Sequence, residues 1–358
     1  MRVLIDIGHP AHVHLFKNLA WRLQENGHIV LFTCRDREHV IHLLKTYGFT
    51  FKNFGKHYIT LKGKLYGLVK NELQTLKAAQ NFKPDLFISH GSTIAAITSY
   101  LIRKPHIALE DTFNMEQVKL YMPLTKVVLT GDYPHKPLSN KEIQYPGYHE
   151  LAYLISSVFT PDESVLKNLA VEKGDKYAII RFVAWNASHD VGHKGLTHET
   201  KIKLIERLSS HLKVFISSEA DLPREFKPYQ IKIKPEEMHS ILAFAHLFVG
   251  ESGTMASEAA VLGTPAIFLN NKHFGCIDDQ AEYGVLFQYS ESQEDQLRLI
   301  DKSVELASRT DKSEYKQKAI RMTNDKIDLS AFLFWFVVNY PESLRETRNE
   351  SFDFNKYK

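Results

Sequence analysis

The chain begins with a short apolar run that ends in a glycine and is followed by a helical pattern. Residues 2–7 are almost uniformly apolar, which is typical of a strand buried on both faces of a parallel sheet. Apolar residues at helical spacing over 13–26 and a second apolar run at 29–33 follow. Because two parallel strands need a crossover connection, this order predicts one βαβ unit, the start of a Rossmann-like domain.

The same alternation continues along the chain. In the first half we expect further strands at residues 49–54, 84–89, 106–109 and 126–130, and helices at residues 38–47, 65–81 and 94–103. The Pro- and Lys-rich residues 131–148 are interpreted as a connection between domains. A second series has strands at residues 176–183, 214–217, 247–250 and 265–269. The sequence therefore predicts an α/β protein built from two doubly wound halves.

A length of 358 residues favours two domains, since a domain typically has about 100–200 residues. We place the first domain at residues 1–155 and the second at residues 156–328. Ligands of such sheets bind beyond the carboxyl ends of the strands, and the two sets of strand ends can face each other across a cleft. Functional residues are therefore expected in the loops that follow strands.

Composition argues against several classes of protein. The chain has 45 Lys and Arg against 42 Asp and Glu, which is not the concentrated positive field of a nucleic-acid-binding protein. The two cysteines and the absence of a charged and then apolar leader predict reduced thiols and a cytoplasmic location. The apolar run at residues 331–338 is far shorter than the ~20 residues of a membrane span. It is interpreted as a buried helix, with peripheral contact at the inner face of a membrane as the alternative.

Histidines are numerous, and three of them lie close together at His9, His12 and His14. Their spacing would let imidazoles converge on a metal ion. The nearby carboxylate, Asp6, falls inside an apolar strand and is a poor partner. We therefore predict no metal here. The alternative roles of the three rings are catalysis or substrate contact, above all for His12, and capping or packing of the first helix.

The strongest motif lies at residues 248–267. A strand ends at Gly250, and Ser252-Gly253-Thr254 opens a helix whose first turn has free N–H groups, a positive dipole end, small side chains and two hydroxyls. These features predict a phosphate-binding site. Glu258, less than two turns further on, could accept hydrogen bonds from a sugar diol, so a nucleotide-sugar is the expected ligand. The alternative is that Ser252 only caps the helix and that Glu258 is solvated.

This segment resembles the donor motif of GT-B-fold glycosyltransferases and of the non-hydrolysing UDP-N-acetylglucosamine 2-epimerases. The resemblance implies that Ser252, Gly253 and Thr254 bind the diphosphate and that Glu258 binds the ribose hydroxyls. It also implies a GT-B-like fold of two Rossmann-like domains facing across a cleft. In that fold, residues 329–358 form a helix and tail that pack back on the N-terminal domain.

The loop at residues 8–19 is similar to the Gly-Gly-His loop of the N-acetylglucosaminyltransferase that makes lipid II. His12 falls on the histidine of that loop, while Pro10 and Ala11 replace its two glycines. Together the motifs resemble a bacterial and archaeal family of GT-B-like proteins of unknown function.

A third loop separates the two kinds of enzyme. The epimerases carry His-Gly-Asp-Thr after the corresponding strand and a Glu after the next one. Glu110 matches that Glu, but Ser92 stands in place of the Asp and cannot act as a carboxylate base. This difference weighs against 2-epimerisation.

Three further residues are candidates for contact with the donor. Arg181 could neutralise phosphate, or could instead pair with a structural carboxylate. Asn186 lies in the loop after the same strand. Gln280 falls in a region that binds donor-sugar hydroxyls in the related transferases.

The sequence thus predicts a metal-independent glycosyltransferase that moves a sugar from a nucleotide-sugar, with UDP as the expected nucleotide, to a glycan or lipid-linked acceptor. We expect no cofactor besides this substrate, no nucleic acid, and a role in cell-surface polysaccharide synthesis. His12, whose ordinary pKa is about 6.5, is the candidate base, and Glu110 is the second candidate catalytic residue. The alternatives are a nucleotide-sugar epimerase and a nucleotide-binding protein without catalytic activity.

Overall fold

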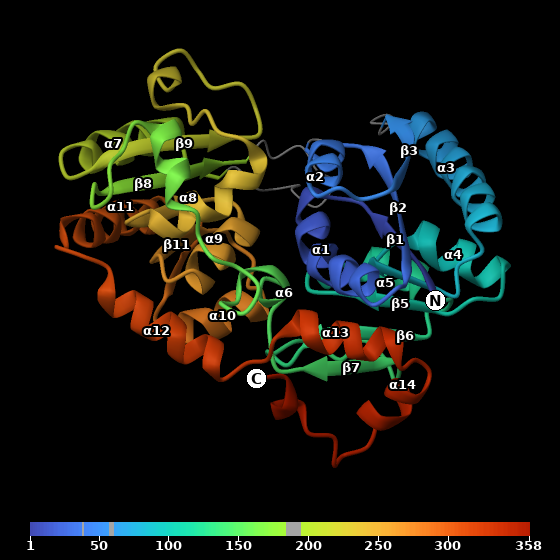
Figure 1. Ribbon diagram of the computed structural model, residues 1–358. Helices are drawn as coiled ribbons and strands as arrows, with labels where there is room; N and C mark the ends of the chain where they lie inside the picture. Colours follow the sequence, from blue (N-terminus) through green and yellow to red (C-terminus); the bar gives the residue numbers. More distant parts are fainter. Residues whose placement is uncertain (38, 57–60, 184–194) are drawn as a thin grey trace. The chain divides into compact units, whose positions relative to one another are not determined.

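The computed structural model describes residues 1–37, 39–56, 61–183 and 195–358, and the chain divides into two compact units. Unit 1 comprises Met1–Tyr153 and Lys326–Lys358, and unit 2 comprises Leu154–Asp325. Each unit has a parallel sheet with helices packed against it (Figure 1).

Within the described residues, the sheet of unit 1 has seven strands in the order β3-β2-β1-β4-β5-β6-β7. Their bounds are β1 (Arg2–Ile7), β2 (Ile29–Asp36), β3 (Phe51–Lys56), β4 (Leu86–His90), β5 (His106–Leu109), β6 (Val127–Gly131) and β7 (Glu142–Tyr145). The chain moves outward from β1 to β3 and then returns to place β4 on the other side of β1. The topological switch point therefore lies between β1 and β4, and such sheets bind ligands beyond the carboxyl ends of the strands at this point.

The helices of unit 1 flank this sheet (Figure 1). They are α1 (Pro10–Glu25), α2 (Val40–Thr46), α3 (Leu61–Phe82), α4 (Thr93–Leu101), α5 (Met115–Tyr121), α13 (Leu329–Val338) and α14 (Glu342–Thr347), while the short α6 (Leu151–Leu154) spans the unit boundary. Helix α1 starts with Pro10, whose fixed φ suits a first helical position, and Gly27 follows its end with φ +78°.

The C-terminal aromatic run forms α13, which contacts α1 inside unit 1. Phe332 and Phe336 are fully buried there, and full burial of such a side chain contributes about 1.5–3 kcal/mol. Among the described residues, no helix combines the length and the apolar character that a bilayer crossing requires.

The interpretation of residues 131–148 as a mere connection was wrong in one part, because β7 lies within them and pairs in parallel with β6. Ile143 and Tyr145 alternate inward along this strand. Four residues beside a Pro- and Lys-rich stretch carry too short an alternation to be recognised. Helix α5 and the strand at residues 286–289 of unit 2 were not predicted either.

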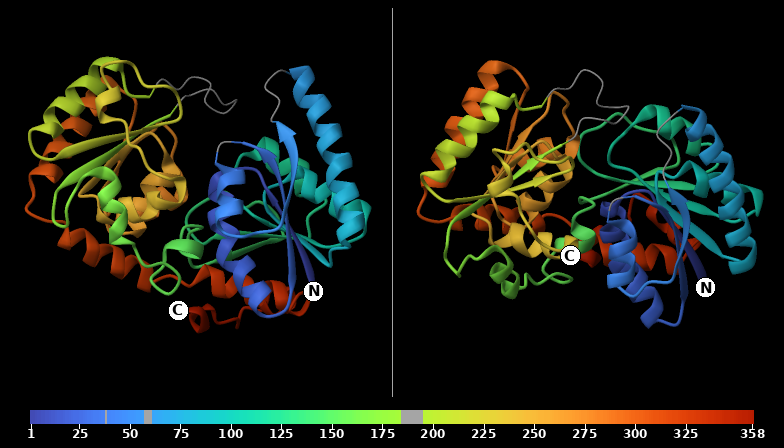
Figure 2. Two further views of the ribbon diagram at one scale, coloured as in Figure 1. Left: turned by 45° about the horizontal axis from the view of Figure 1, so that its top comes forward. Right: turned by 90° about the horizontal axis from the view of Figure 1, so that it is seen from above.

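Within the described residues, unit 2 has a five-stranded sheet in the order β12-β11-β10-β8-β9. The strands are β8 (Tyr177–Phe182), β9 (Lys213–Ser218), β10 (Leu247–Gly250), β11 (Ala266–Leu269) and β12 (Leu286–Tyr289). The helices are α7 (His198–Ser209), α8 (Met238–Phe244), α9 (Gly253–Val261), α10 (Gly275–Glu282), α11 (Gln293–Ser308) and α12 (Ser313–Asn324). Helices α7 and α11 pack together on one face, and α8, α9 and α10 lie on the other (Figure 2). The switch point of this sheet lies between β8 and β10.

Candidate functional site

The switch point of unit 1 is surrounded by polar side chains from the loops after β1, β4 and β5. His12 lies in the first turn of α1, where its Nδ1 accepts a 3.3 Å hydrogen bond from the Gly8 N–H. Burial, followed by the neighbouring His90, lowers the pKa of His12 well below its ordinary value. The neutral ring then carries its proton on Nε2. His12 therefore presents a hydrogen-bond donor, and accepting a proton at Nε2 would require the ring to release the Gly8 N–H.

His90, Asp111 and His149 form one connected group next to His12. The Asp111 carboxylate accepts hydrogen bonds from His90 Nε2 at 2.8 Å and from His149 Nδ1 at 2.9 Å. The rings of His90 and His12 stack with centroids 4.4 Å apart. The loops bring these residues together from distant positions in the sequence.

Asp111 and His90 each stabilise the charged form of the other. Although burial opposes the charged form of the ring, the Asp111 carboxylate raises the pKa of His90 to about 9. Burial likewise opposes the charged form of the carboxyl group, but the imidazoles of His149 and His90 hold the pKa of Asp111 well below its usual range. The group therefore contains an ion pair at neutral pH.

His9 and His14 each make a hydrogen bond outside this group. His9 caps α1, its Nδ1 accepting a hydrogen bond from the Ala11 N–H at 3.2 Å. His14 Nδ1 lies 3.3 Å from the hydroxyl of Tyr47. The rings of His9 and His12 lie with centroids 5.9 Å apart, but His9, His12 and His14 do not form a group of metal-ligating atoms among the described residues.

Ser92 and Asp6 meet between β1 and β4. The Ser92 hydroxyl donates to Asp6 Oδ2 at 2.6 Å and also accepts from the Ala95 N–H, so that it caps α4. Asp6 is buried, and its Oδ1 accepts from the Thr33 hydroxyl at 2.7 Å. Ser92 therefore caps α4, and Asp6 links Ser92 to Thr33 of β2.

Glu110, the predicted acidic residue, turns into its own loop. Its Oε1 accepts hydrogen bonds from the N–H and the hydroxyl of Thr112 and from the N–H of Phe113, at 2.7–2.9 Å. Its Oε2 accepts from the Tyr121 hydroxyl at 2.6 Å. With 2% of its surface exposed, Glu110 anchors the loop between β5 and α5. Its neighbour Asp111 is the carboxylate that reaches the histidines.

In unit 2, the predicted diphosphate motif lies at the switch point, directly after β10. Ser252 caps α9, and its Oγ accepts from the Met255 N–H at 3.4 Å. Gly253 is partly exposed and Thr254 is exposed at the first turn, whose N–H groups have no partner within an α-helix. The structure thus brings the three predicted residues together at one helix end.

Glu258 lies further along α9 and is buried, in contrast to the alternative of a solvated side chain. Its Oε1 is 3.0 Å from His239 Nε2 on α8, and 4% of the residue is exposed. Its role in binding ribose stays a prediction.

Arg181 and Gln280 both have protein partners. The guanidinium of Arg181 donates to Ser217 Oγ at 2.7 Å and to Glu219 Oε1 at 2.9 Å. The amide of Gln280 is fully buried and donates to Ser257 Oγ at 2.7 Å. Arg181 thus has a carboxylate partner, as the alternative described, and contact of Arg181 and Gln280 with a donor stays a prediction. Asn186 lies outside the described residues.

Glu251 was not singled out from the sequence. Its buried carboxylate accepts hydrogen bonds from the Val183 N–H at 2.8 Å and from the Leu196 N–H at 2.7 Å. Lys201 Nζ lies 3.8 Å from its Oε1. A lone Glu after a strand gives no signal for this role, because both partners are backbone groups far away in the sequence.

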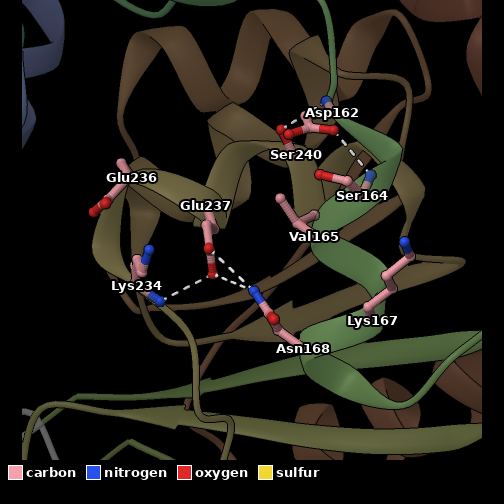
Figure 3. A pocket seen from close by; sticks show the side chains of 9 residues that line it. All are labelled: Asp162, Ser164, Val165, Lys167, Asn168, Lys234, Glu236, Glu237 and Ser240. Atoms are coloured by element: carbon pink, nitrogen blue, oxygen red, sulfur yellow. Dashed lines mark hydrogen bonds between the residues drawn. The ribbon is translucent and has the colours of Figure 1, made fainter.

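A separate cavity of about 560 Å³ opens in unit 2 between η1 (Glu163–Leu169) and η4 (Pro235–Glu237) (Figure 3). Its polar groups pair with one another, as when Asn168 Nδ2 donates to both carboxylate oxygens of Glu237 at 3.1 Å. It is lined by residues other than the predicted donor-binding ones.

A family model described as "Protein of unknown function (DUF354)" matches residues 1–340. The chain belongs to the DUF354 family. A curated relative, the uncharacterized protein MJ0665 of Methanocaldococcus jannaschii, is 28% identical over 276 residues, which cover 74% of this chain and 80% of the relative.

Three solved structures resemble this DUF354 protein along nearly its whole length. A putative UDP-N-acetylglucosamine 2-epimerase from Listeria monocytogenes has a TM-score of 0.69 at 14% identity and 99% coverage of both chains. The UDP-GlcNAc 2-epimerase from Neisseria meningitidis bound to UDP-GlcNAc has a TM-score of 0.64 at 14% identity, covering 97% of this chain and 100% of that chain. Spinosyn rhamnosyltransferase SpnG has a TM-score of 0.61 at 15% identity, covering 95% of this chain and 100% of that chain. The predicted GT-B-like class, with two parallel α/β sheets, is thereby confirmed.

Proposed function

We propose that the protein is a glycosyltransferase that binds a nucleotide-sugar at the start of α9 and transfers the sugar to an acceptor hydroxyl. The observation that carries this proposal is the placement of Ser252, Gly253 and Thr254 at the switch point of the unit 2 sheet, on the first turn of α9. Backbone N–H groups and the dipole of a helix N-terminus favour phosphate.

The comparisons support a nucleoside diphosphate as the ligand. Similar structures are described as a 2-epimerase bound to UDP-GlcNAc and as a rhamnosyltransferase complexed with thymidine diphosphate. In the proposed reaction the first turn of α9 stabilises the negative charge of the departing diphosphate without a metal ion at that position.

Transfer is favoured over epimerisation by what this chain has at the two positions where the epimerases carry acidic residues, namely Ser92 and Glu110 in unit 1. Epimerisation at C2 needs a group that removes a proton from carbon. Here Ser92 offers a hydroxyl that is already bonded to Asp6, and Glu110 accepts four hydrogen bonds inside its own loop. Transfer needs only one group to receive the proton of an acceptor hydroxyl. We assign this role to His12 from its place at the switch point of unit 1, with the ring releasing the Gly8 N–H as it accepts the proton at Nε2.

Calorimetric titration with UDP tests the donor site. Ser252→Ala removes the capping hydroxyl of α9, which costs about 1 kcal/mol of stability, and we expect it to weaken UDP binding as well. Ser292→Ala is the matched control, because Ser292 caps α11 in the same unit through a hydrogen bond from the Asp295 N–H. Equal UDP affinities of the two variants would contradict the proposed site.

A second experiment separates transfer from epimerisation. The protein is incubated with UDP-N-acetylglucosamine in deuterated water without an acceptor. Transfer predicts that C2 acquires no deuterium and that the second epimer is not formed. Deuterium at C2 would support the epimerase instead.

A further inference from the structure

Two imidazoles and one carboxylate converge at the carboxyl end of the unit 1 sheet. His90 ends β4, Asp111 follows β5, and His149 precedes α6. One ligand-capable atom from each residue lies within 4.8 Å of the other two. We propose that His90, Asp111 and His149 form a binding site for a divalent transition-metal ion such as zinc.

The chemistry of the three side chains fits such an ion. Imidazole nitrogen and carboxylate oxygen are both zinc ligands, and a set of three protein ligands leaves one position open for water or a substrate. Two histidines with one carboxylate are also a known set for other divalent ions of the first transition row.

The distances fit as well. Tetrahedral zinc with ligands at about 2.0–2.1 Å separates neighbouring ligand atoms by roughly 3.3 Å. His90 Nε2 lies 2.8 Å from Asp111 Oδ1 and His149 Nδ1 lies 2.9 Å from Asp111 Oδ2, and one ligand atom from each of the three residues lies within 4.8 Å of the other two. Side-chain rotations that bring these atoms to that spacing would admit an ion. Each imidazole would then bind the ion through the nitrogen that now faces Asp111. His90 would release the proton of that nitrogen to solvent, and the His149 ring would carry its proton on Nε2, which has no partner among the described residues.

Burial supports a built site that an ion can still reach. The exposed fraction is 6% for the side chain of His149, 12% for His90 and 27% for Asp111. The buried Nε2 of His149 has no hydrogen-bond partner among the described residues, so the ring is held from the side of Asp111. A cation would enter past Asp111, the negatively charged member.

This site differs from the histidines that suggested a metal in the sequence. His9 and His14 are engaged elsewhere, whereas the proposed ligands come from three separate loops. It also involves unit 1 alone, so it does not depend on diphosphate binding by α9 in unit 2.

The test is a titration of the chelator-treated full-length protein with Co²⁺, read by visible absorption, and with Zn²⁺, read by calorimetry. We expect one equivalent of either ion to bind. Asp111→Asn, which keeps the shape of the side chain, and His149→Ala should each weaken binding by at least about 100-fold, since even residues beyond the ligands change metal affinity by 10–100-fold.

His135→Ala is the matched control. His135 is also buried in unit 1 and its Nε2 contacts the carboxylate of Glu142, but this pair includes a single imidazole. The control should bind Co²⁺ as the wild type does, and circular dichroism shows whether each variant is folded. Wild-type protein that binds neither ion, or undiminished binding in folded Asp111→Asn, would overturn the proposal.

Discussion

His239 Nε2 lies 3.0 Å from Glu258 Oε1, and both side chains are buried. The contact joins α8 to α9 on one face of the unit 2 sheet, so it helps to place the helix whose first turn carries Ser252. A carboxylate that was predicted to bind ribose is thus also part of the support of the helix. Substitutions at this position have to separate the two roles.

Glu258→Ala removes a hydrogen-bond partner of a buried imidazole, which typically costs about 1–3 kcal/mol. Glu258→Gln keeps an oxygen that can face His239, and we expect it to retain most of the stability. Urea unfolding of the two variants measures the difference. Equal destabilisation by Gln and Ala would show that the contact with His239 does not hold α9.

Glu110 is expected to behave as a structural anchor of its loop. Glu110→Ala leaves the N–H groups of Thr112 and Phe113 and the hydroxyl of Tyr121 without their acceptor, so we expect a loss of about 3 kcal/mol or more in the free energy of unfolding. Tyr121→Phe removes one of these bonds and should cost about 1 kcal/mol. A Glu110→Ala protein as stable as the wild type would contradict this assignment.

His106 makes stability depend on pH. Burial lowers the pKa of His106 to about 3, and its two nitrogens contact the hydroxyls of Ser89 and Thr125. The unfolded chain takes up a proton near pH 6.5 and the folded protein does not, so this contribution is complete above pH 6.5 and is lost as the pH falls toward 3.

The slope of this loss is at most about 1.4 kcal/mol per pH unit. His106→Gln removes the titrating group, so the comparison with the wild type by urea unfolding between pH 6.5 and 4 isolates its effect from the carboxyl groups. Parallel stability curves for the two proteins would show that His106 does not titrate in this way.

We expect alanine to lower the stability of the protein at Gly250 but not at Gly253. A Cβ at Gly250 would lie 2.9 Å from both Cβ and O of Arg181, where β10 passes β8, so we expect Gly250→Ala to cost about 1–3 kcal/mol. A Cβ at Gly253 meets its nearest atom, in the ring of Phe268, at an ordinary 3.4 Å. Thermal unfolding should show Gly253→Ala to be as stable as the wild type, and a similar loss in both variants would contradict the close approach at Gly250.

The same pair of glycines shows what sequence could predict. The motif from Gly250 to Glu258 is contiguous, so the strand and the helix start follow from local pattern, and the proposal of a diphosphate site follows from the chemistry of a helix end. The βαβ unit at the N-terminus was predictable for the same reason. The four-residue strands β7 and β12 contain Glu or Gln, so they lack the continuous apolar run by which β5, β10 and β11, of the same length, were predicted.

The group of His90, Asp111 and His149 could not be predicted in this way. Its members approach one another because β4 and β5 are neighbours in the sheet and because the chain returns after β7. The resemblance to the epimerases led to Glu110 and left its neighbour Asp111 unconsidered. Consecutive side chains after a strand point in different directions, and only the folded loop shows which carboxylate reaches His90.

The binding of UDP by calorimetry to the wild type, to Thr254→Asp and to Gln293→Asp tests the central claim most directly. Both substitutions put an acidic side chain on an exposed first turn of a helix in unit 2, where it stabilises the helix by about 0.3–1 kcal/mol. We predict that Thr254→Asp remains folded and binds UDP at least about tenfold more weakly, because its carboxylate repels the diphosphate. We also predict that Gln293→Asp binds UDP as the wild type does. Undiminished binding by Thr254→Asp would contradict the assignment of the diphosphate to the start of α9.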